Sequence, residues 1–445
     1  MLRLGKSVPI GIIIVVLLIA PFYDVLRALL SRNVPFLGAI QEVFVVVLVI
    51  IAITSTYQRK NNKFRLVFVD YLVIIYILWN LIQVIQSPSI LGGLYVWRWY
   101  SIGPFTYFAL RLYKFNSREL NLISVAFTGG LVMAAVFILY QYFILGPEGA
   151  AQFSTSLGFT VMYRFGWRIA GSFGSPLVAS ASMSLLMICG SAISVAKRSY
   201  LLGLSLIGLG IVSCFLTLSR TGMVFGLIGI IGIIFLAKRK FSSIILVILL
   251  IPIISISSVY VTFSSIGQKL IMYTFGPRSN KDDLLRISTF DYILKDSIRH
   301  PLGRGFGGGG AVSSAAFSLF GGDESLLVNQ NQLGGDSLIM ATLQSAGWIG
   351  VICFIGILAI FIKTAINVNH KDKDTQVISL MAIGLFIGTI ATLANLMDVW
   401  PLKLYLWLFG ALVINYQSYA HLSSIRNNVI HISTSNSTYG KIDIG

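Results

Sequence analysis

Charged residues and cysteines are both scarce in this chain, and each scarcity limits what the protein can be. Only 11% of the 445 residues are charged and 56% are hydrophobic, which excludes an ordinary soluble domain and indicates a polytopic membrane protein. The three cysteines, Cys189, Cys214 and Cys353, lie in apolar stretches without the spacing of metal ligands. They are interpreted as small apolar fillers, and no metal or other cofactor is expected.

Long apolar stretches recur along the whole chain. A helix needs about 20 apolar residues to cross roughly 30 Å of hydrocarbon, and windows of that length predict an all-α polytopic membrane protein with about twelve transmembrane helices. The first window is too long for the apolar core of a signal peptide and is followed directly by others, so we expect it to be retained. The predicted spans are 8–29, 36–56, 66–86, 93–112, 121–145, 170–196, 200–218, 219–237, 241–263, 337–362, 376–398 and 402–418.

The net charge of +17 would suit a nucleic-acid partner, but the distribution of the basic residues argues against one. With a cytoplasmic N-terminus, every second connection between spans carries Lys or Arg. These connections and the two chain ends together hold 19 of the 33 basic residues. This bias predicts an even number of spans and two cytoplasmic termini. The residues are Arg3, Lys6, Arg59, Lys60, Lys63, Arg65, Arg111, Lys114, Arg118, Lys197, Arg198, Lys238, Arg239, Lys240, Lys363, Lys371, Lys373, Arg426 and Lys441.

The segment between the ninth and tenth predicted spans differs from the rest. Residues 264–336 hold seven acidic and seven basic side chains, and the alternation of spans places them outside the cytoplasm. The predicted organisation is therefore helices one to nine over 1–263, an extracytoplasmic loop with short amphipathic helices over 264–336, helices ten to twelve over 337–418, and a flexible cytoplasmic tail over 419–445. We expect the chemistry to lie in this loop and in the arginines that face it.

Arginines at the outer ends of spans are candidates for a site, because a charge in the bilayer costs several kcal/mol unless it faces a partner or a cavity. Arg220 opens the eighth span within Ser219-Arg-Thr-Gly222. Arg164 and Arg168 precede the small-residue turn Gly171-Ser-Phe-Gly-Ser-Pro176. The alternative for each of the three is an arginine that snorkels to lipid headgroups.

A fourth arginine, Arg98, lies at the outer end of the fourth span. It is surrounded by aromatic residues in Tyr95-Val-Trp-Arg-Trp-Tyr100. Aromatic residues gather at membrane interfaces, so an interface belt explains Arg98 better than a site does.

Within the loop, apolar residues recur at helical spacing from Asp282 to the His300-Pro301 pair. They predict an amphipathic helix that lies on the membrane and ends at the proline. Arg286, on the polar side of this helix, is a site candidate. The alternative is an ion pair with Asp282 or Asp283 at helical distance.

A glycine-rich run, His300-Pro-Leu-Gly-Arg-Gly-Phe-Gly307, follows this helix. The glycines at 303, 305 and 308 match the dinucleotide pattern G-x-G-x-x-G by spacing. The match is interpreted as accidental, since no strand precedes it and no helix of a βαβ unit follows. The run instead predicts a turn whose bare backbone can approach a sugar or a phosphate closely.

Asp336 stands at the entrance of the tenth span in Gly334-Gly-Asp-Ser-Leu338. As an N-cap it would accept hydrogen bonds from free backbone amides at the start of the helix. That role is compatible with a catalytic one. A carboxylate held at this level of the membrane can be partly desolvated and ready to accept a proton.

Taken in order, these motifs resemble the O-antigen polymerase and O-antigen ligase superfamily. The resemblance rests on Arg168-Ile-Ala-Gly-Ser-Phe-Gly-Ser-Pro176, Ser219-Arg-Thr-Gly222, Arg286 followed by His300-Pro-Leu-Gly-Arg-Gly-Phe-Gly307, and Asp336-Ser-Leu ahead of Ala346-Gly-Trp-Ile-Gly350. Proteins of this kind are metal-independent glycosyltransferases of the bacterial inner membrane. The resemblance implies polyprenyl-pyrophosphate-linked oligosaccharides as donor and acceptor, membrane lipid and a chain-length regulator as partners, no nucleic acid, and a site that faces the periplasm.

By the same resemblance, Arg220 and Arg286 are expected to hold the pyrophosphate, with contributions from Arg164 and Arg168. Substrate contacts are expected from His300 and Arg304. Asp336 is the expected general base on the acceptor hydroxyl, with inversion at the sugar C1. Arginine suits the first task because a guanidinium stays charged and binds phosphate oxygens in pairs.

One departure from the pattern favours the polymerase branch. The ligase branch typically has a histidine where this chain has Asp336. Ligation to lipid A-core is therefore the alternative within the superfamily. A flippase or other transporter of lipid-linked sugars, or a non-catalytic assembly subunit, would be alternatives outside it, although transporters usually have short outer loops.

Overall fold

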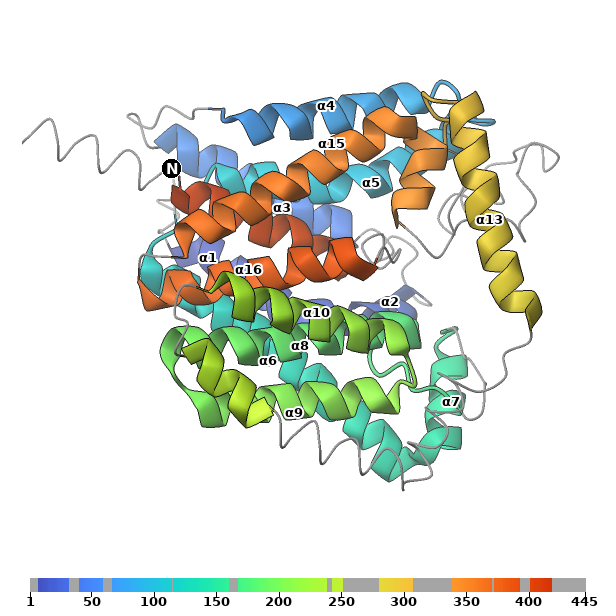
Figure 1. Ribbon diagram of the computed structural model, residues 1–445. Coiled ribbons are helices and arrows are strands. Elements are labelled where there is room, and N and C mark those ends of the chain that lie inside the picture. The colour runs from blue at the N-terminus through green and yellow to red at the C-terminus, as the bar shows by residue number, and fades with distance from the viewer. Residues whose placement is uncertain are drawn as a thin grey trace, which may run out of the picture.

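The chain folds as a bundle of helices. The computed structural model describes residues 7–31, 40–58, 66–113, 115–159, 167–237, 242–250, 280–306, 338–369, 372–392 and 401–417. These residues form helices and connecting turns without any strand (Figure 1). The helices are α1 (Ser7–Ile19), η1 (Ala20–Phe22), α2 (Tyr23–Ser31), α3 (Ile40–Gln58), α4 (Phe68–Gln83), α5 (Ile90–Arg111), α6 (Ser117–Tyr140), η3 (Gln141–Leu145), α7 (Gly146–Ser156), α8 (Pro176–Lys197), α9 (Tyr200–Leu216), α10 (Arg220–Leu236), α13 (Asn280–Arg299), α15 (Leu338–Val368) and α16 (Lys373–Thr392), with further helical residues at 242–250 and 402–417.

Five of these helical segments are long and apolar enough to cross a membrane: Ile10–Leu29, Ser117–Ser156, Pro176–Lys197, Ile339–Val368 and Lys373–Ile390. Large apolar side chains on the outside of the bundle agree with a lipid environment, because a water-soluble protein rarely exposes so much apolar surface. Leu201 is 84% exposed, Ile85 78% and Phe235 71%. The predicted class, an all-α membrane protein, is confirmed.

The helices begin and end close to where the sequence predicts spans, with three differences. The predicted tenth span ends at residue 362, whereas α15 continues to Val368. The predicted sixth span begins at residue 170, whereas α8 begins at Pro176, because Gly171 adopts a φ of +63° and Ser175 caps the helix by accepting a hydrogen bond from Val178 N. The predicted fifth span ends at residue 145, whereas helical structure continues through α7 to Ser156. Of the predicted ninth span, 241–263, only 242–250 is described.

The helices alternate in direction, so their ends gather in two sets. We call these sets the Arg111 end and the Arg168 end. At the Arg111 end, α4 and α16 begin while α5 and α8 finish, as the Arg111–Asp70 and Lys197–Asp374 ion pairs demonstrate. At the Arg168 end, α9 finishes and α8, α10 and α15 begin. The N-terminus of α1 lies at the Arg111 end (Figure 1).

Helix α8 is the centre of the bundle. Every residue from Val178 to Ala196 is buried, and many are Ser, Ala or Gly. Small side chains let helices approach closely in a membrane. A Cβ added to Gly203 of α9 would lie 1.8 Å from Ser194 Oγ. Helices α6, α9, α10 and α16 therefore pack around α8.

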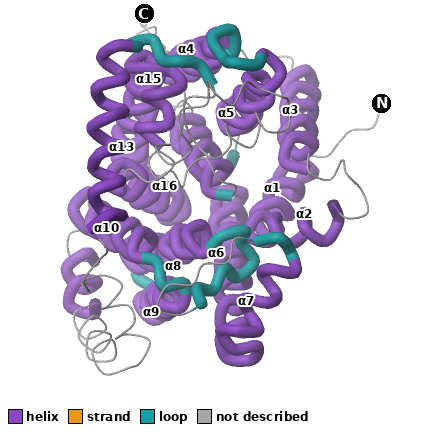
Figure 2. The backbone as a smooth tube through the Cα atoms, turned by 90° about the vertical axis from the view of Figure 1, so that its right-hand side faces the viewer, coloured by secondary structure: helices purple, strands orange, loops and turns teal. Residues whose placement is uncertain are grey.

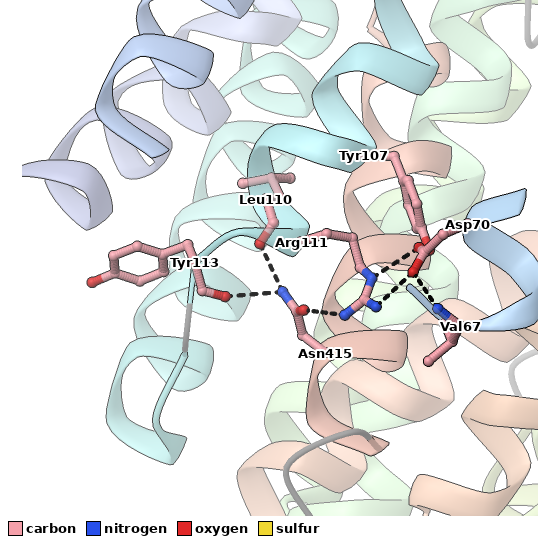
Figure 3. A network of polar contacts seen from close by, with 7 residues as sticks. All are labelled: Val67, Asp70, Tyr107, Leu110, Arg111, Tyr113 and Asn415. Carbon is pink, nitrogen blue, oxygen red and sulfur yellow. Dashed lines mark hydrogen bonds and ion pairs between the residues drawn. The ribbon is translucent and has the colours of Figure 1, made fainter. Parts of the chain in front are cut away.

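A buried ion pair joins three helices at the Arg111 end (Figure 3). Arg111 donates from Nε to Asp70 Oδ1 at 3.1 Å and from Nη2 to Asp70 Oδ2 at 2.9 Å, and its Nη1 donates to Asn415 Oδ1 at 2.7 Å. Tyr107 donates its hydroxyl to Asp70. The sequence places Arg111 in a basic cytoplasmic connection. In the structure Arg111 is the last residue of α5, and its side chain is 4% exposed and paired inside the bundle.

A second carboxylate, Asp372, connects helices at the same end. It caps α16 by accepting hydrogen bonds from Thr375 N and Oγ1, and it also accepts from Ser117 and Tyr416. Burial raises the pKa of Asp372, but these hydrogen bonds stabilise the carboxylate by more and hold its pKa below the ordinary value. The two networks connect described helix ends at the Arg111 end by hydrogen bonds.

Candidate functional site

The predicted site residues fall into three groups. The side chains of Arg168, His300 and Arg304 are described. Arg220 begins α10 and Arg286 lies within α13, but their side chains are outside the described part. Arg164, Asp336 and the glycines from Gly307 to Gly310 lie outside the described residues altogether.

Arg168 begins a loop that runs to Ser175 at the Arg168 end. The loop has no regular structure, so its backbone groups need partners from elsewhere. Gly171 N donates to Gln141 Oε1 at 3.0 Å, and Gln141 Nε2 donates back to Gly171 O at 3.2 Å. Gln141 is fully buried and is the first residue of the π-helical turn η3. Turns of this kind are frequent at functional sites.

The same loop is also held by the first helices of the chain. Gly174 N donates to Asp24 Oδ2 at 2.7 Å, and Ser172 Oγ donates to Pro21 O at 2.7 Å. Asp24 lies in α2 and Pro21 in η1, about 150 residues before the loop. The side chains of Gln141 and Asp24 and the backbone carbonyl of Pro21, from three helical segments, therefore fix the loop that follows Arg168.

The Arg168 side chain contacts the turn that leads into α10. It is 7% exposed, and its Nε donates to Thr217 O at 3.1 Å. Leu218, the next residue of the turn, has a φ of +50°, a conformation that costs a non-glycine residue roughly 1–3 kcal/mol. Arg168 thus contacts Thr217, which lies three residues before Arg220 in the sequence. The structure brings these two predicted arginines to the same place in the bundle.

The motif Ser219-Arg-Thr-Gly222 packs directly on α8. Ser180 Oγ donates to Ser219 O at 3.2 Å, and a Cβ on Gly222 would lie 1.9 Å from Ser180 Oγ. Glycine at 222 therefore permits the start of α10 to lie against α8. Arg220 begins a helix whose first turn is fixed by a buried contact.

The second predicted motif, the turn over residues 300–306, pairs with α15. Arg304 N donates to Gln344 O at 2.9 Å, Gly305 N donates to Ser345 O at 3.1 Å, and Trp348 N donates to Pro301 O at 3.0 Å. The turn and the Ala346-Gly-Trp-Ile-Gly350 motif are therefore in direct contact. We call this set of three backbone hydrogen bonds the 300–306 contact.

Glycines make this close approach possible. Gly303 has a φ of +93°, and a Cβ there would lie 2.5 Å from Ser345 O. Gly347 has a φ of +63°, and a Cβ there would lie 2.3 Å from Pro301 O. The sequence predicts that the bare backbone of the glycine run approaches a sugar or a phosphate. At Gly303 the backbone approaches α15 instead.

Helix α4 covers the other side of the turn. Gln83 Nε2 donates to Leu302 O at 3.0 Å, and Phe306 N donates to Ser87 Oγ at 3.0 Å. The ring of Phe306 is fully buried, with its centroid 5.6 Å from that of Tyr100 in α5. Three helices therefore hold the turn in one position.

The charges of the turn are partly neutralised by one carboxylate of α13. Asp296 is 6% exposed and accepts a hydrogen bond from Arg304 Nη2, and His300 Nε2 lies 3.9 Å from Asp296 Oδ1. The Arg304 side chain is about one third exposed. Arg304 and His300 thus lie together at the Arg168 end, and the charge of Arg304 is already paired.

Helix α13 crosses the Arg168 end, as the end-on view of Figure 2 makes visible. It runs from beside α15 toward the level of α10 (Figures 1 and 2). Ile293 is buried against Met340 and Leu343 of α15, whereas Asp291 and Lys295 form an exposed ion pair at 2.5 Å. The helix occupies the range in which the sequence predicts an amphipathic helix, and Ile293, with Tyr292 and Leu294 partly buried beside it, packs on protein.

Arg98 has a local explanation. Its Nη2 lies 3.2 Å from Glu42 Oε1 of α3, and its guanidinium lies 4.5 Å from the ring centroid of Tyr95. These contacts agree with the interpretation that Arg98 belongs to an aromatic belt.

Sequence reasoning missed Gln141, Asp24 and Gln83. Asp24 carried a signal, since a carboxylate inside the first predicted span needs a partner. No local pattern singles out Gln141 or Gln83. Among the residues that the structure describes, no group of three or more His, Cys, Asp or Glu is close enough to hold a metal ion.

Comparison with known proteins does not place the chain in a family. No family model matches the sequence, and no curated protein matches it.

Proposed function

We propose that this chain is an inner-membrane glycosyltransferase that polymerises polyprenyl-pyrophosphate-linked oligosaccharide repeat units into O-antigen or a related surface polysaccharide. The observation that supports it most is the convergence at the Arg168 end. Arg168 contacts the turn that leads to Arg220, and the α13 helix, which contains Arg286, crosses the same end. Two of these motifs are in contact, and the helix that holds the third lies at the same end of the bundle.

The proposed topology has twelve spans, with both termini and the Arg111 end in the cytoplasm. The 264–336 segment and the Arg168 end face the periplasm. Basic residues at the ends of helices agree with this orientation, since Lys197 finishes α8 and Lys373 begins α16 at the Arg111 end. Lipid-linked substrates would approach from the outer leaflet.

The proposed reaction is an inverting glycosyl transfer. The acceptor hydroxyl gives its proton to Asp336 and its oxygen attacks C1 of the donor sugar. The bond between C1 and the pyrophosphate oxygen breaks, and the pyrophosphate leaves with the electron pair. Arg220 and Arg286, with Arg164 and Arg168 beside them, stabilise the departing negative charge. Removing one such contact should cost about 2–4 kcal/mol in the transition state, or roughly 30- to 1,000-fold in rate.

The preorganisation of Arg168 supports this role. Electrostatic catalysis is effective when the charged groups are fixed before the reaction. Buried hydrogen bonds from Gln141 and Asp24 hold the loop that begins at Arg168. A headgroup anchor would need no such fixed surroundings, because a snorkelling arginine reaches toward solvent, whereas Arg168 is 7% exposed.

Chain-length analysis of surface polysaccharide in cells tests the proposal. Arg220→Ala and Arg286→Ala should each abolish long polymer while the protein remains inserted in the membrane, and Arg220→Lys should restore part of it. Lys295→Ala is the matched control on α13, since Lys295 is exposed and pairs only with Asp291 among the described residues. Normal chain-length ladders from both alanine variants would rule out the mechanism.

A deletion strain separates the proposal from its alternatives. Single repeat units that accumulate on the outer face of the membrane indicate a missing polymerase. Accumulation on the inner face indicates a missing flippase, and lipid-linked long polymer that never reaches lipid A-core indicates a missing ligase. A non-catalytic subunit would tolerate charge removal at Arg220, Arg286 and Asp336.

A further inference from the structure

Gln344 is a buried amide whose hydrogen-bonding groups have no partner in the part of the chain that the structure describes. Its side chain is 3% exposed, and neither Oε1 nor Nε2 has a hydrogen-bond partner among the described residues. A buried amide without partners is costly, so each example in a folded protein needs an explanation. Nothing in the sequence marks Gln344, and the proposed reaction does not use it.

The position of Gln344 on α15 directs it toward α13. Met340 and Leu343 of α15 pack with Ile293 of α13, and all three positions 340, 343 and 344 precede the kink of α15 at Gly347. Gln344 lies one turn after Met340, so it shares the face of the helix on which Met340 lies. Asp296 follows Ile293 by three residues on α13. The amide therefore lies at the junction of α13 and α15.

Arg304 belongs to the same junction. Its backbone N donates to Gln344 O at 2.9 Å, and its Nη2 donates to Asp296. Its Nε is buried and has no partner among the described residues. The Arg304 side chain is the partly exposed member of the group, so a ligand would enter past it. The junction thus offers two unused donors, Arg304 Nε and Gln344 Nε2, and one unused acceptor, Gln344 Oε1.

The charge of this group selects the kind of ligand. Asp296 already pairs with the Arg304 guanidinium, and Gln344 is neutral, so the group carries no net charge. A diphosphate only accepts hydrogen bonds and would meet the Gln344 carbonyl oxygen unfavourably. Neighbouring sugar hydroxyls both donate and accept, and they match an amide beside a guanidinium.

We propose that Gln344 and Arg304 form a subsite for the uncharged sugar of the lipid-linked substrate, separate from the arginines that hold its pyrophosphate. This subsite rests on the proposed function, because the sugar is the glycan of that substrate. It gives the Gln344 amide the hydrogen-bond partners that the described residues do not supply.

Binding measured without turnover tests the subsite on the full chain in lipid nanodiscs. The first probe is the oligosaccharide repeat that mild acid releases from the polysaccharide of the producing strain, and the second is inorganic pyrophosphate. Gln344→Met keeps the side-chain volume and removes the unpartnered amide. It should weaken oligosaccharide binding at least ten-fold, leave pyrophosphate binding unchanged, and leave the midpoint of thermal unfolding unchanged or higher.

Thr342→Val is the matched control. Thr342 is 1% exposed and its Oγ1 also lacks a partner among the described residues. Its Cγ2, however, lies on the side of α15 toward Gly350 and Trp79 of α4. This variant should bind the oligosaccharide as the unaltered protein does.

Two results would overturn the subsite. The first is that Gln344→Met binds the oligosaccharide as tightly as the unaltered protein does, whether or not its unfolding midpoint falls. Such a result would mean that the Gln344 amide has only a structural role. The second is an unaltered protein that binds no oligosaccharide. If the protein binds the oligosaccharide through Gln344 but elongates no lipid-linked repeat, the subsite stands and the proposed polymerase fails.

Discussion

Replacing Gly347 by alanine should open the 300–306 contact. Gly347 has φ +63° and ψ −165°, a combination that is essentially restricted to glycine. An added Cβ would lie 2.3 Å from Pro301 O and 2.4 Å from Gly303 N. Both neighbours are backbone atoms, so no side chain can move to make room. The turn must therefore separate from α15.

The three backbone hydrogen bonds set the size of the effect. Each contributes about 0.5–1.5 kcal/mol, so separation of the turn should cost about 2–4 kcal/mol. Keeping the turn in contact with α15 would cost the alanine variant more than this, because of the clash and the strained backbone conformation. Separation of the turn from α15 is therefore the outcome of lower free energy. An opening equilibrium shifted by this energy corresponds to roughly 30- to 1,000-fold faster exchange of the amides that the contact protects.

Hydrogen–deuterium exchange measures this opening directly. The amides of Arg304, Gly305 and Trp348 should be protected in the unaltered protein and exchange faster by that factor in Gly347→Ala. Gly356→Ala is the control in the same helix, since a Cβ there would meet only Leu72 Cδ1, at 3.6 Å. Unaltered protection of the three amides in Gly347→Ala would refute the reasoning.

Three further predictions concern the rest of the bundle. Arg111→Met leaves the fully buried Asp70 uncompensated, and should lower the free energy of unfolding in mixed micelles by about 3–5 kcal/mol; a loss below about 1 kcal/mol would contradict this. Gln141→Leu removes both hydrogen bonds to Gly171, and should lower the rate of elongation in a purified assay more than it changes substrate binding; an unaltered rate would show that the loop needs no such support. The pKa of Asp372 is depressed in the folded protein, so its contribution to stability is complete above the ordinary carboxyl value and is lost only as the pH falls below about 4; Asp372→Asn should remove this pH dependence from the unfolding midpoint.

The positions of the helices could be predicted from the sequence because the signal is local. An apolar window of sufficient length specifies a membrane helix wherever it lies, and Pro176 and Gly171 explain why α8 begins later than its apolar window does. The helix α13 was likewise predictable from its apolar spacing and from the proline that follows it.

The contacts of the candidate site could not be predicted in the same way. Gln141 and Gly171 are 30 residues apart, and Asp24 and Gly174 are 150 apart, so no spacing rule connects them. Arg304 pairs with Asp296 only because the chain reverses at the turn between them. Arg111 resembles a loop residue in sequence, and its burial depends on a carboxylate 41 residues away.

Elongation by the purified chain tests the central claim most directly. The protein in lipid nanodiscs receives a synthetic polyprenyl-pyrophosphate-linked repeat unit in the presence of excess chelator, and the products are separated by size. The proposal predicts a ladder that grows by one repeat at a time and disappears with Arg220→Ala. Two results would contradict it. One is that the folded protein yields no product longer than one repeat, and the other is that Arg220→Ala leaves the ladder unchanged.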